Sequence, residues 1–125
     1  MEIEAGIICL VEFPFTDQAA SKLRPALVAG VDNPLFLAVT DGVCSPAGMN
    51  VSFLQITSRE DPGVYNVIVD PSLPGNDITG LRKISTIRCW NINTIHRGFI
   101  KMAIGRLPEP IMKEVKDKLR ERLGL

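Results

Sequence analysis

Histidine, cysteine and aromatic residues are scarce in this chain. Its 125 residues include one histidine, three cysteines and only 6% aromatic side chains. A single histidine excludes a ribonuclease mechanism in which two histidines share the proton transfers. The cysteines, Cys9, Cys44 and Cys89, are odd in number and far apart, which is not the pattern of a zinc site or a disulfide framework. We expect reduced thiols in a cytoplasmic protein, with no metal ion or other cofactor.

Long apolar runs and several familiar catalytic signatures are also absent. No segment approaches the roughly 18 uninterrupted apolar residues of a membrane-spanning helix. The first apolar run is broken at Glu12 and has no basic segment before it, so we expect neither a secretory signal nor a membrane anchor. The sequence has no P-loop, no G-x-S-x-G elbow and no paired carboxylates at helical spacing. With 46% hydrophobic residues, the chain can bury a core, and we expect one domain over residues 1–125.

Acidic and basic side chains are equal in number, 14 of each, but they are unevenly distributed. Residues 1–60 contain seven acidic and three basic residues. Between Asp77 and Glu109 there is no acidic residue, and the basic ones are Arg82, Lys83, Arg88, Arg97, Lys101 and Arg106. This stretch either forms a local anion-binding face or is scattered around a small barrel, and charge alone leaves both open.

Short apolar and β-branched segments separated by turn residues predict an antiparallel sheet or small β-barrel. We expect strands at residues 6–13, 26–31, 35–40, 51–57, 64–69, 83–90 and 98–104, with a turn at 59–63 and longer loops at 15–23, 41–50 and 70–80. After Pro110 the period changes, and apolar residues fall every fourth position at Ile111, Val115, Leu119 and Leu123. This pattern predicts one amphipathic helix, begun at Pro110 and ended at Gly124, that packs on the barrel and takes a partial role in a dimer.

Arg24 is the first candidate functional residue because it lies directly before Pro25 at the start of a predicted strand. Proline biases the preceding residue toward an extended backbone, so the guanidinium can be held over a groove. A guanidinium is always charged and forks onto phosphate. The alternative is a surface arginine paired with Asp17 or Glu12, which the spacing alone favours.

Thr57 and Ser58 place two hydroxyls at the end of another predicted strand. They either bind a phosphate or ribose hydroxyl, or cap the turn that begins at Arg59, and composition favours the cap. His96 is able to act as a general acid or base, but a lone histidine more often lies exposed in a turn.

Four sequence blocks follow one another along nearly the whole chain. They are FPFTD at 13–17 with KLRPALV at 22–28, ITS at 56–58, GLRKISTIR at 80–88 with NTI at 93–95, and IGRL at 104–107. In this order and spacing they resemble the MazF/PemK family of toxin–antitoxin ribonucleases. The resemblance implies an SH3-like barrel, usually a homodimer, that cuts single-stranded RNA without a metal ion and is inhibited by a cognate antitoxin.

The same resemblance implies catalytic roles for Arg24, Thr57 and Arg88. The implied reaction is attack of a ribose 2′-hydroxyl on the adjacent phosphate, which leaves a 2′,3′-cyclic phosphate and a 5′-hydroxyl. Arginines suit the charged phosphorane, and a hydroxyl suits the orientation of the reacting group. The RNA-binding residues expected beside them are Lys22, Ser58, Arg82, Lys83 and Trp90.

Trp90 stands where many relatives have an acidic residue, so no acid–base role is transferred to this position. Its ring either stacks on an RNA base or packs in the core, and its place at the end of an apolar strand favours the core. A second interpretation of the chain is a protein-binding module without cleavage, which grips gyrase, as CcdB toxins of similar fold do, or an antitoxin. The neutral total charge keeps this interpretation open.

Overall fold

Six strands and one C-terminal helix make up the computed structural model, which describes residues 3–12, 23–31 and 50–125. The elements are β1 Ile7–Glu12, β2 Leu23–Val31, β3 Asn50–Thr57, β4 Asn66–Val69, β5 Ser85–His96, β6 Ile100–Arg106 and α2 Glu109–Leu123, with short 3₁₀ turns at Asn76–Thr79 and Arg97–Phe99. Lys22 and the predicted strand at 35–40 lie outside the described residues. In the part of the chain that the structure describes, no helix has the length and apolar character needed to cross a membrane.

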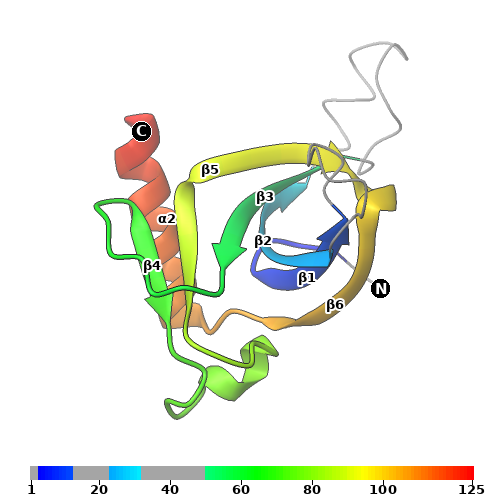
Figure 1. The fold of residues 1–125 in the computed structure, drawn as a ribbon. Coiled ribbons are helices and arrows are strands. Elements are labelled where there is room, and N and C mark those ends of the chain that lie inside the picture. The colour runs from blue at the N-terminus through cyan, green and yellow to red at the C-terminus, as the bar shows by residue number, and fades with distance from the viewer. Residues whose placement is uncertain (1–2, 13–22, 32–49) are drawn as a thin grey trace.

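The strands form one antiparallel sheet in the order β4-β5-β3-β2-β1-β6. The sheet curls strongly around its own axis (Figure 1). The predicted mainly β class with a C-terminal helix is confirmed; among the described residues the curled sheet is not closed, because no pairing joins its edge strands β4 and β6.

The 3₁₀ turn at Asn76–Thr79 packs on β6. Glycine permits this close approach: a Cβ at Gly105 would lie 2.3 Å from the carbonyl oxygens of Ile78 and Thr79. Gly80, at φ +73°, ends the turn in the left-handed region, where glycine has no steric penalty. The loop that carries Arg82 and Lys83 is thereby fixed against the sheet.

Alternation along the strands divides the interior into two cores. One core contains Leu27, Leu54 and Ile87 and is covered by helix α2. The other contains Ala26 and Phe53, whose side chains lie on the other face of the same strands. Cys9 and Cys89 are free thiols on these strands, and burial raises the pKa of each to about 11. They are protonated core groups at neutral pH, while Cys44 lies outside the described residues.

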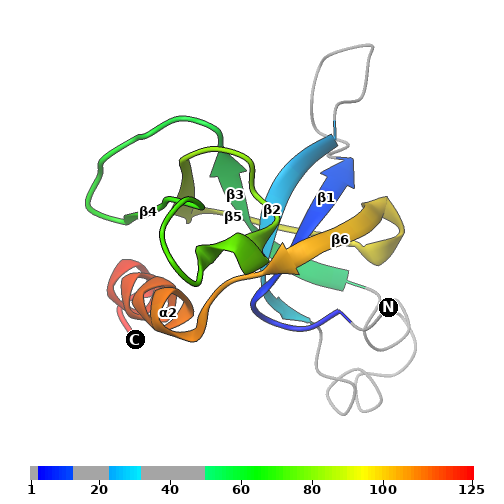
Figure 2. The same cartoon turned by 90° about the horizontal axis from the view of Figure 1, so that it is seen from below.

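Helix α2 packs against β5 and β4 at one side of the sheet (Figure 2). Pro110 lies in its first turn, and Gly124 follows it at φ +73°, as expected. Met112 and Val115 are its buried residues. The predicted apolar stripe is right for Val115 but wrong for Leu123, which is 53% exposed, because the last turn extends beyond the sheet.

Strand β5 is longer than predicted and carries an irregularity that determines the site. Leu54 pairs with Ile92, yet the next residue, Gln55, pairs with Arg88. The segment 89–91 therefore has no partner on β3, and β5 continues to His96 instead of ending at Trp90. Such a bulge bends a strand and redirects its side chains.

Candidate functional site

Strand register brings Arg24, Thr57 and Arg88 to one face of the sheet. Ala26 pairs with Gln55, and Gln55 pairs with Arg88, across three neighbouring strands. Because alternate residues of a strand share a face, Arg24 lies on the side of Ala26, and Thr57 on the side of Gln55. This is the face of the second core, which ends here in polar side chains.

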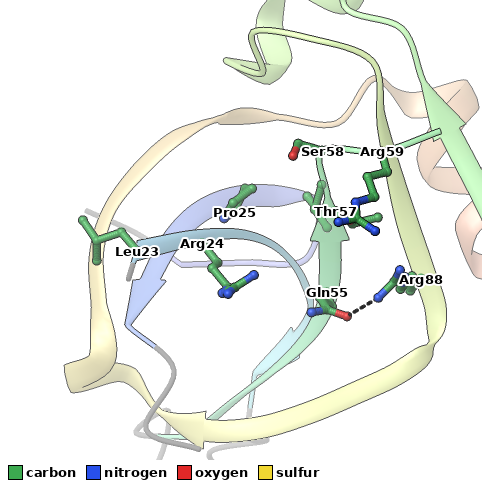
Figure 3. Close-up of a pocket in the computed structure, with 9 residues that line it drawn as sticks. Leu23, Arg24, Pro25, Gln55, Thr57, Ser58, Arg59 and Arg88 are labelled. Atoms are coloured by element: carbon green, nitrogen blue, oxygen red, sulfur yellow. Dashed lines mark hydrogen bonds between the residues drawn. The ribbon is translucent and has the colours of Figure 1, made fainter. Parts of the chain in front are cut away.

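These side chains line a cavity of about 480 Å³. Its lining residues are Leu23, Arg24, Pro25, Gln55, Ile56, Thr57, Ser58, Arg59 and Arg88, and we call it the Arg24–Arg88 cavity. Figure 3 places Arg24 and Arg88 on either side of Gln55, with Thr57 and Arg59 nearby. Among the described residues, this lining contains three guanidinium groups and no carboxylate. Such a lining favours a bound anion, because opposite charge gathers where like charges converge.

Arg24 is exposed and, within residues 3–12, 23–31 and 50–125, has no carboxylate partner. Glu12, one of the two partners that the sequence offered, pairs instead with Lys101 at 3.1 Å. The other, Asp17, lies outside the described residues. The guanidinium of Arg24 is therefore available to a ligand in the cavity.

The hydroxyls of Thr57 and Ser58 do not cap the following turn. The hydroxyl of Thr86 does so: it donates to the carbonyl of Arg59 at 2.6 Å and accepts from the N–H of Asp61 at 2.9 Å. The turn-cap alternative is therefore wrong. Thr57 and Ser58 line the cavity, and neither hydroxyl caps the turn.

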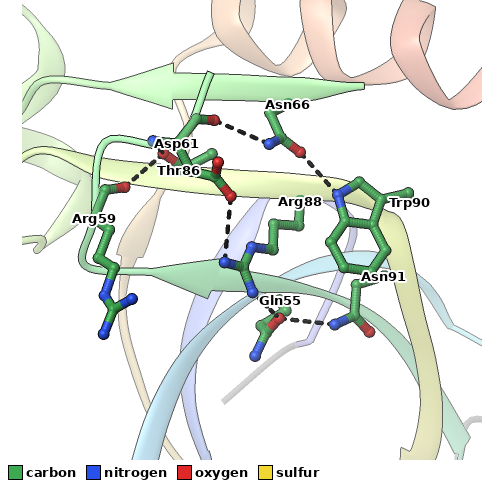
Figure 4. A network of polar contacts seen from close by, with 8 residues as sticks. All are labelled: Gln55, Arg59, Asp61, Asn66, Thr86, Arg88, Trp90 and Asn91. Atoms are coloured by element: carbon green, nitrogen blue, oxygen red, sulfur yellow. Dashed lines mark hydrogen bonds and ion pairs between the residues drawn. The ribbon is translucent and has the colours of Figure 1, made fainter. Parts of the chain in front are cut away.

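Arg88 is held by several neighbours at once (Figure 4). One terminal nitrogen donates to Gln55 Oε1 at 3.2 Å, and the other donates to Asp61 Oδ2 at 3.3 Å. The guanidinium carbon lies 5.7 Å from the centre of the Trp90 ring, within the range of a cation–π contact. The buried Nε–H has no acceptor among the residues that the structure describes, and an unpaired buried donor costs about 1–3 kcal/mol.

Trp90 is 46% exposed, so the expectation that it packs in the core is wrong. It belongs to the unpaired bulge segment of β5, which turns its ring out of the sheet. The indole Nε1–H donates to Asn66 Oδ1 at 3.0 Å. His96 is also exposed, and its Nδ1 accepts from the N–H of Gly98 at 2.9 Å, as befits a residue at a turn.

Arg82 and Lys83 do not join the Arg24–Arg88 cavity. They line a second cavity of about 520 Å³, which we call the Arg82–Lys83 cavity. Its other lining residues are Asp70, Pro71, Ser72, Asp77, Leu81 and Ile84. The basic stretch of the sequence is thus divided between separate surfaces, and this one includes two carboxylates.

Gln55, Arg59 and Asp61 are site residues that sequence reasoning missed. Gln55 left one usable signal, because it is a polar residue in the apolar run at 51–56. Asp61 left none, because its contact with Arg88 joins residues 27 positions apart. In the part of the chain described here, no three His, Cys, Asp or Glu side chains are grouped as metal ligands.

A family model decides the relationship that the motifs suggested. The model of PemK-like, MazF-like toxins of type II toxin–antitoxin systems matches residues 4–123. The chain belongs to this family. No curated protein matches it.

Solved structures of MazF toxins share this fold. Mycobacterium tuberculosis toxin MazF-mt6 has a TM-score of 0.66 at 19% identity, over 95% of this chain and 97% of its own. An endoribonuclease in complex with its cognate antitoxin, from a mycobacterial species, has a TM-score of 0.66 at 16% identity, over 99% of this chain and 97% of its own. MazE-MazF from Deinococcus radiodurans has a TM-score of 0.65 at 21% identity, over 98% of this chain and 96% of its own. At sequence identities of 16% to 21%, these matches show that the fold is shared.

Proposed function

We propose that this toxin-family protein is a metal-independent endoribonuclease that cuts single-stranded RNA in the Arg24–Arg88 cavity. One observation carries the proposal: in the part of the chain that the structure describes, three guanidinium groups and two strand-end hydroxyls line a single cavity without a carboxylate. This combination suits a phosphodiester whose charge increases during reaction.

In the proposed reaction, the ribose 2′-oxygen attacks the adjacent phosphorus, and the bond from phosphorus to the 5′-oxygen breaks. The 2′-hydroxyl loses a proton and the departing 5′-oxygen gains one, so no water is consumed. Arg24 and Arg88 bind the non-bridging oxygens as their charge increases, while Thr57 orients the attacking hydroxyl.

RNA binding is proposed to extend beyond the reacting phosphate. Ser58 contributes a hydrogen bond, and Lys22, Arg82 and Lys83 attract the phosphate backbone. The outer surface of Trp90 offers a stacking platform for a base, which is worth roughly 1–3 kcal/mol per base in such sites.

Two further partners belong to the proposal. A disordered antitoxin segment rich in acidic and apolar residues is suited to the basic cavity and would compete with RNA there. A homodimer is proposed as the working form. Two of the structural relatives are complexes with an antitoxin or MazE.

The deciding experiment compares wild type with Arg24→Ala on a long single-stranded RNA in excess EDTA. Wild type should cut and leave cyclic phosphate and 5′-hydroxyl ends, while Arg24→Ala should be slower by roughly 10²–10³-fold, the usual effect of removing one transition-state donor. Arg122→Ala is the matched control, because Arg122 is an exposed arginine near the end of α2.

Equal rates in the Arg24→Ala and Arg122→Ala proteins would remove Arg24 from the mechanism. Dependence of the rate on added divalent metal would contradict the metal-independent reaction. Absence of cutting by folded wild type on varied RNAs would favour the protein-binding interpretation, and gyrase and antitoxin pull-downs would then follow.

A further inference from the structure

Arg88 is enclosed by a circuit of contacts that the reaction itself does not explain. Asp61 Oδ2 accepts from Arg88 at 3.3 Å, and Arg88 lies over the Trp90 ring at 5.7 Å. Trp90 donates to Asn66 Oδ1 at 3.0 Å, and Asn66 Nδ2 donates back to the carbonyl of Asp61 at 2.9 Å. We call Asp61, Asn66 and Trp90 the Arg88 clamp (Figure 4).

The clamp is anchored at both ends to the folded sheet. The N–H of Asp61 donates to Thr86 Oγ1 at 2.9 Å, and Asn66 is paired with Arg88 in the ladder between β4 and β5. These main-chain contacts do not use the carboxylate of Asp61. Its side chain therefore has one observed contact among the described residues, the ion pair with Arg88.

The clamp leaves Arg88 able to bind a ligand. Its two terminal nitrogens carry four N–H groups, and Gln55 and Asp61 accept from one on each nitrogen. The other two remain, and Arg88 lines the cavity with Arg24. A guanidinium fixed in this way meets a phosphate without first losing its rotational freedom, which is the advantage of a preorganised donor.

We propose that Asp61 is a positioning residue that, through the Arg88 clamp, aims the guanidinium of Arg88 at the RNA phosphate. This inference rests on the proposed ribonuclease function. The carboxylate also cancels one positive charge beside the cavity, so Asp61 improves orientation at the expense of attraction for RNA. Removing it should slow cleavage while leaving RNA binding equal or tighter, whereas general damage to the fold would weaken both.

The test compares Asp61→Ala, Asp61→Asn and the control Glu60→Ala. Alanine removes the carboxylate but retains the main-chain contacts with Thr86 and Asn66. Asparagine retains the shape and an acceptor oxygen, so it should rescue part of the effect. Glu60 is the neighbouring exposed acid with no contact to Arg88, and its replacement makes the same charge change at nearly the same place.

Four quantities are measured: kcat and KM for RNA cleavage, the Kd for a fully 2′-O-methylated single-stranded RNA, and the fluorescence emission of Trp90. Trp90 is the only tryptophan of the chain, so its emission reports on the clamp in the absence of RNA. We expect Asp61→Ala to lower kcat by about tenfold or more, to leave KM and Kd equal or lower, and to alter the Trp90 emission. Asp61→Asn should be intermediate, and Glu60→Ala should keep the kcat and the emission of wild type.

The inference is overturned if the kcat of Asp61→Ala stays within about twofold of wild type, or if Glu60→Ala loses as much. Should Asp61→Ala fail to fold, the same criteria apply to Asp61→Asn. If wild type cuts no RNA, the proposed function fails, and the Trp90 emission alone decides whether Asp61 positions Arg88. A change in Asp61→Ala that is absent from Glu60→Ala supports the clamp, and identical spectra refute it.

Discussion

The Arg24–Arg88 cavity and the Arg82–Lys83 cavity both contain basic side chains but differ in the acidic groups beside them. Within residues 3–12, 23–31 and 50–125, the lining of the Arg24–Arg88 cavity has three guanidinium groups and no carboxylate. The Arg82–Lys83 cavity has one arginine and one lysine beside Asp70 and Asp77. Charges of both signs cancel at short range, so only the first cavity concentrates positive potential. A count of basic residues along the sequence therefore says little about where an anion binds.

The hydroxyl groups of the two cavities also differ in the hydrogen bonds that they make. Ser72 donates its hydroxyl to Asp70 at 2.7 Å, and its N–H donates to the same carboxylate at 3.0 Å. These bonds lower the pKa of Asp70 below its usual range. Thr57, by contrast, is not engaged in holding the adjacent turn. The hydroxyl of Ser72 is therefore used within its own cavity, which makes it a suitable contrast to that of Thr57.

Replacing one hydroxyl in each cavity tests this difference most strongly. Thr57→Val should lower kcat by up to about tenfold, the worth of one well-placed hydrogen bond, with little change in thermal stability. Ser72→Ala is the matched control and should keep the rate of wild type. Single-turnover cleavage of RNA measures both. An unchanged rate in Thr57→Val would remove its hydroxyl from the reaction.

Local patterns were sufficient to predict the helix and most of the strands. Pro110 and Gly124 indicated the limits of α2, and the order of apolar runs gave β1, β2, β3, β4 and β6 to within a few residues. These features depend on neighbours in sequence, where side-chain period and backbone preference act directly. Arg24 and Thr57 were recognisable because the motifs that contain them are short and contiguous.

The division of the basic stretch between two cavities was beyond sequence reasoning. It depends on the unpaired segment 89–91 of β5, which turns Trp90 outward and brings Arg88 opposite Gln55. It also depends on the 3₁₀ turn at Asn76–Thr79, which packs on β6 shortly before Arg82 and Lys83 in the chain. Both are long-range packing outcomes, and neither side-chain period nor local propensity encodes them.

Neutralising the basic pair of the second cavity should have a smaller effect than any change around Arg24. The Arg82→Ala/Lys83→Ala protein should bind single-stranded RNA a few-fold more weakly, with kcat within about twofold of wild type. For single strands, each phosphate contact contributes about 0.7 to the slope of the logarithm of the binding constant against the logarithm of the salt concentration. Because Asp70 and Asp77 offset the two positive charges, each removed basic residue should change this slope by less than that value. Titrations at several salt concentrations measure it. A loss of kcat as large as that of Thr57→Val would mean that the second cavity takes part in the reaction.

The smallest expected effect comes from making the second cavity resemble the first. Asp77→Asn removes one lining carboxylate, so the affinity for single-stranded RNA should rise by less than about threefold at low salt and return to the wild-type value as salt screens the charge. Glu121→Gln, at an exposed acid of helix α2, controls for the change in net charge alone. If both variants gained the same RNA affinity, the total charge would explain the effect. The balance of acidic and basic residues within each cavity would then not determine the affinity. A gain confined to Asp77→Asn would establish that carboxylates near Arg82 and Lys83 restrain RNA binding there.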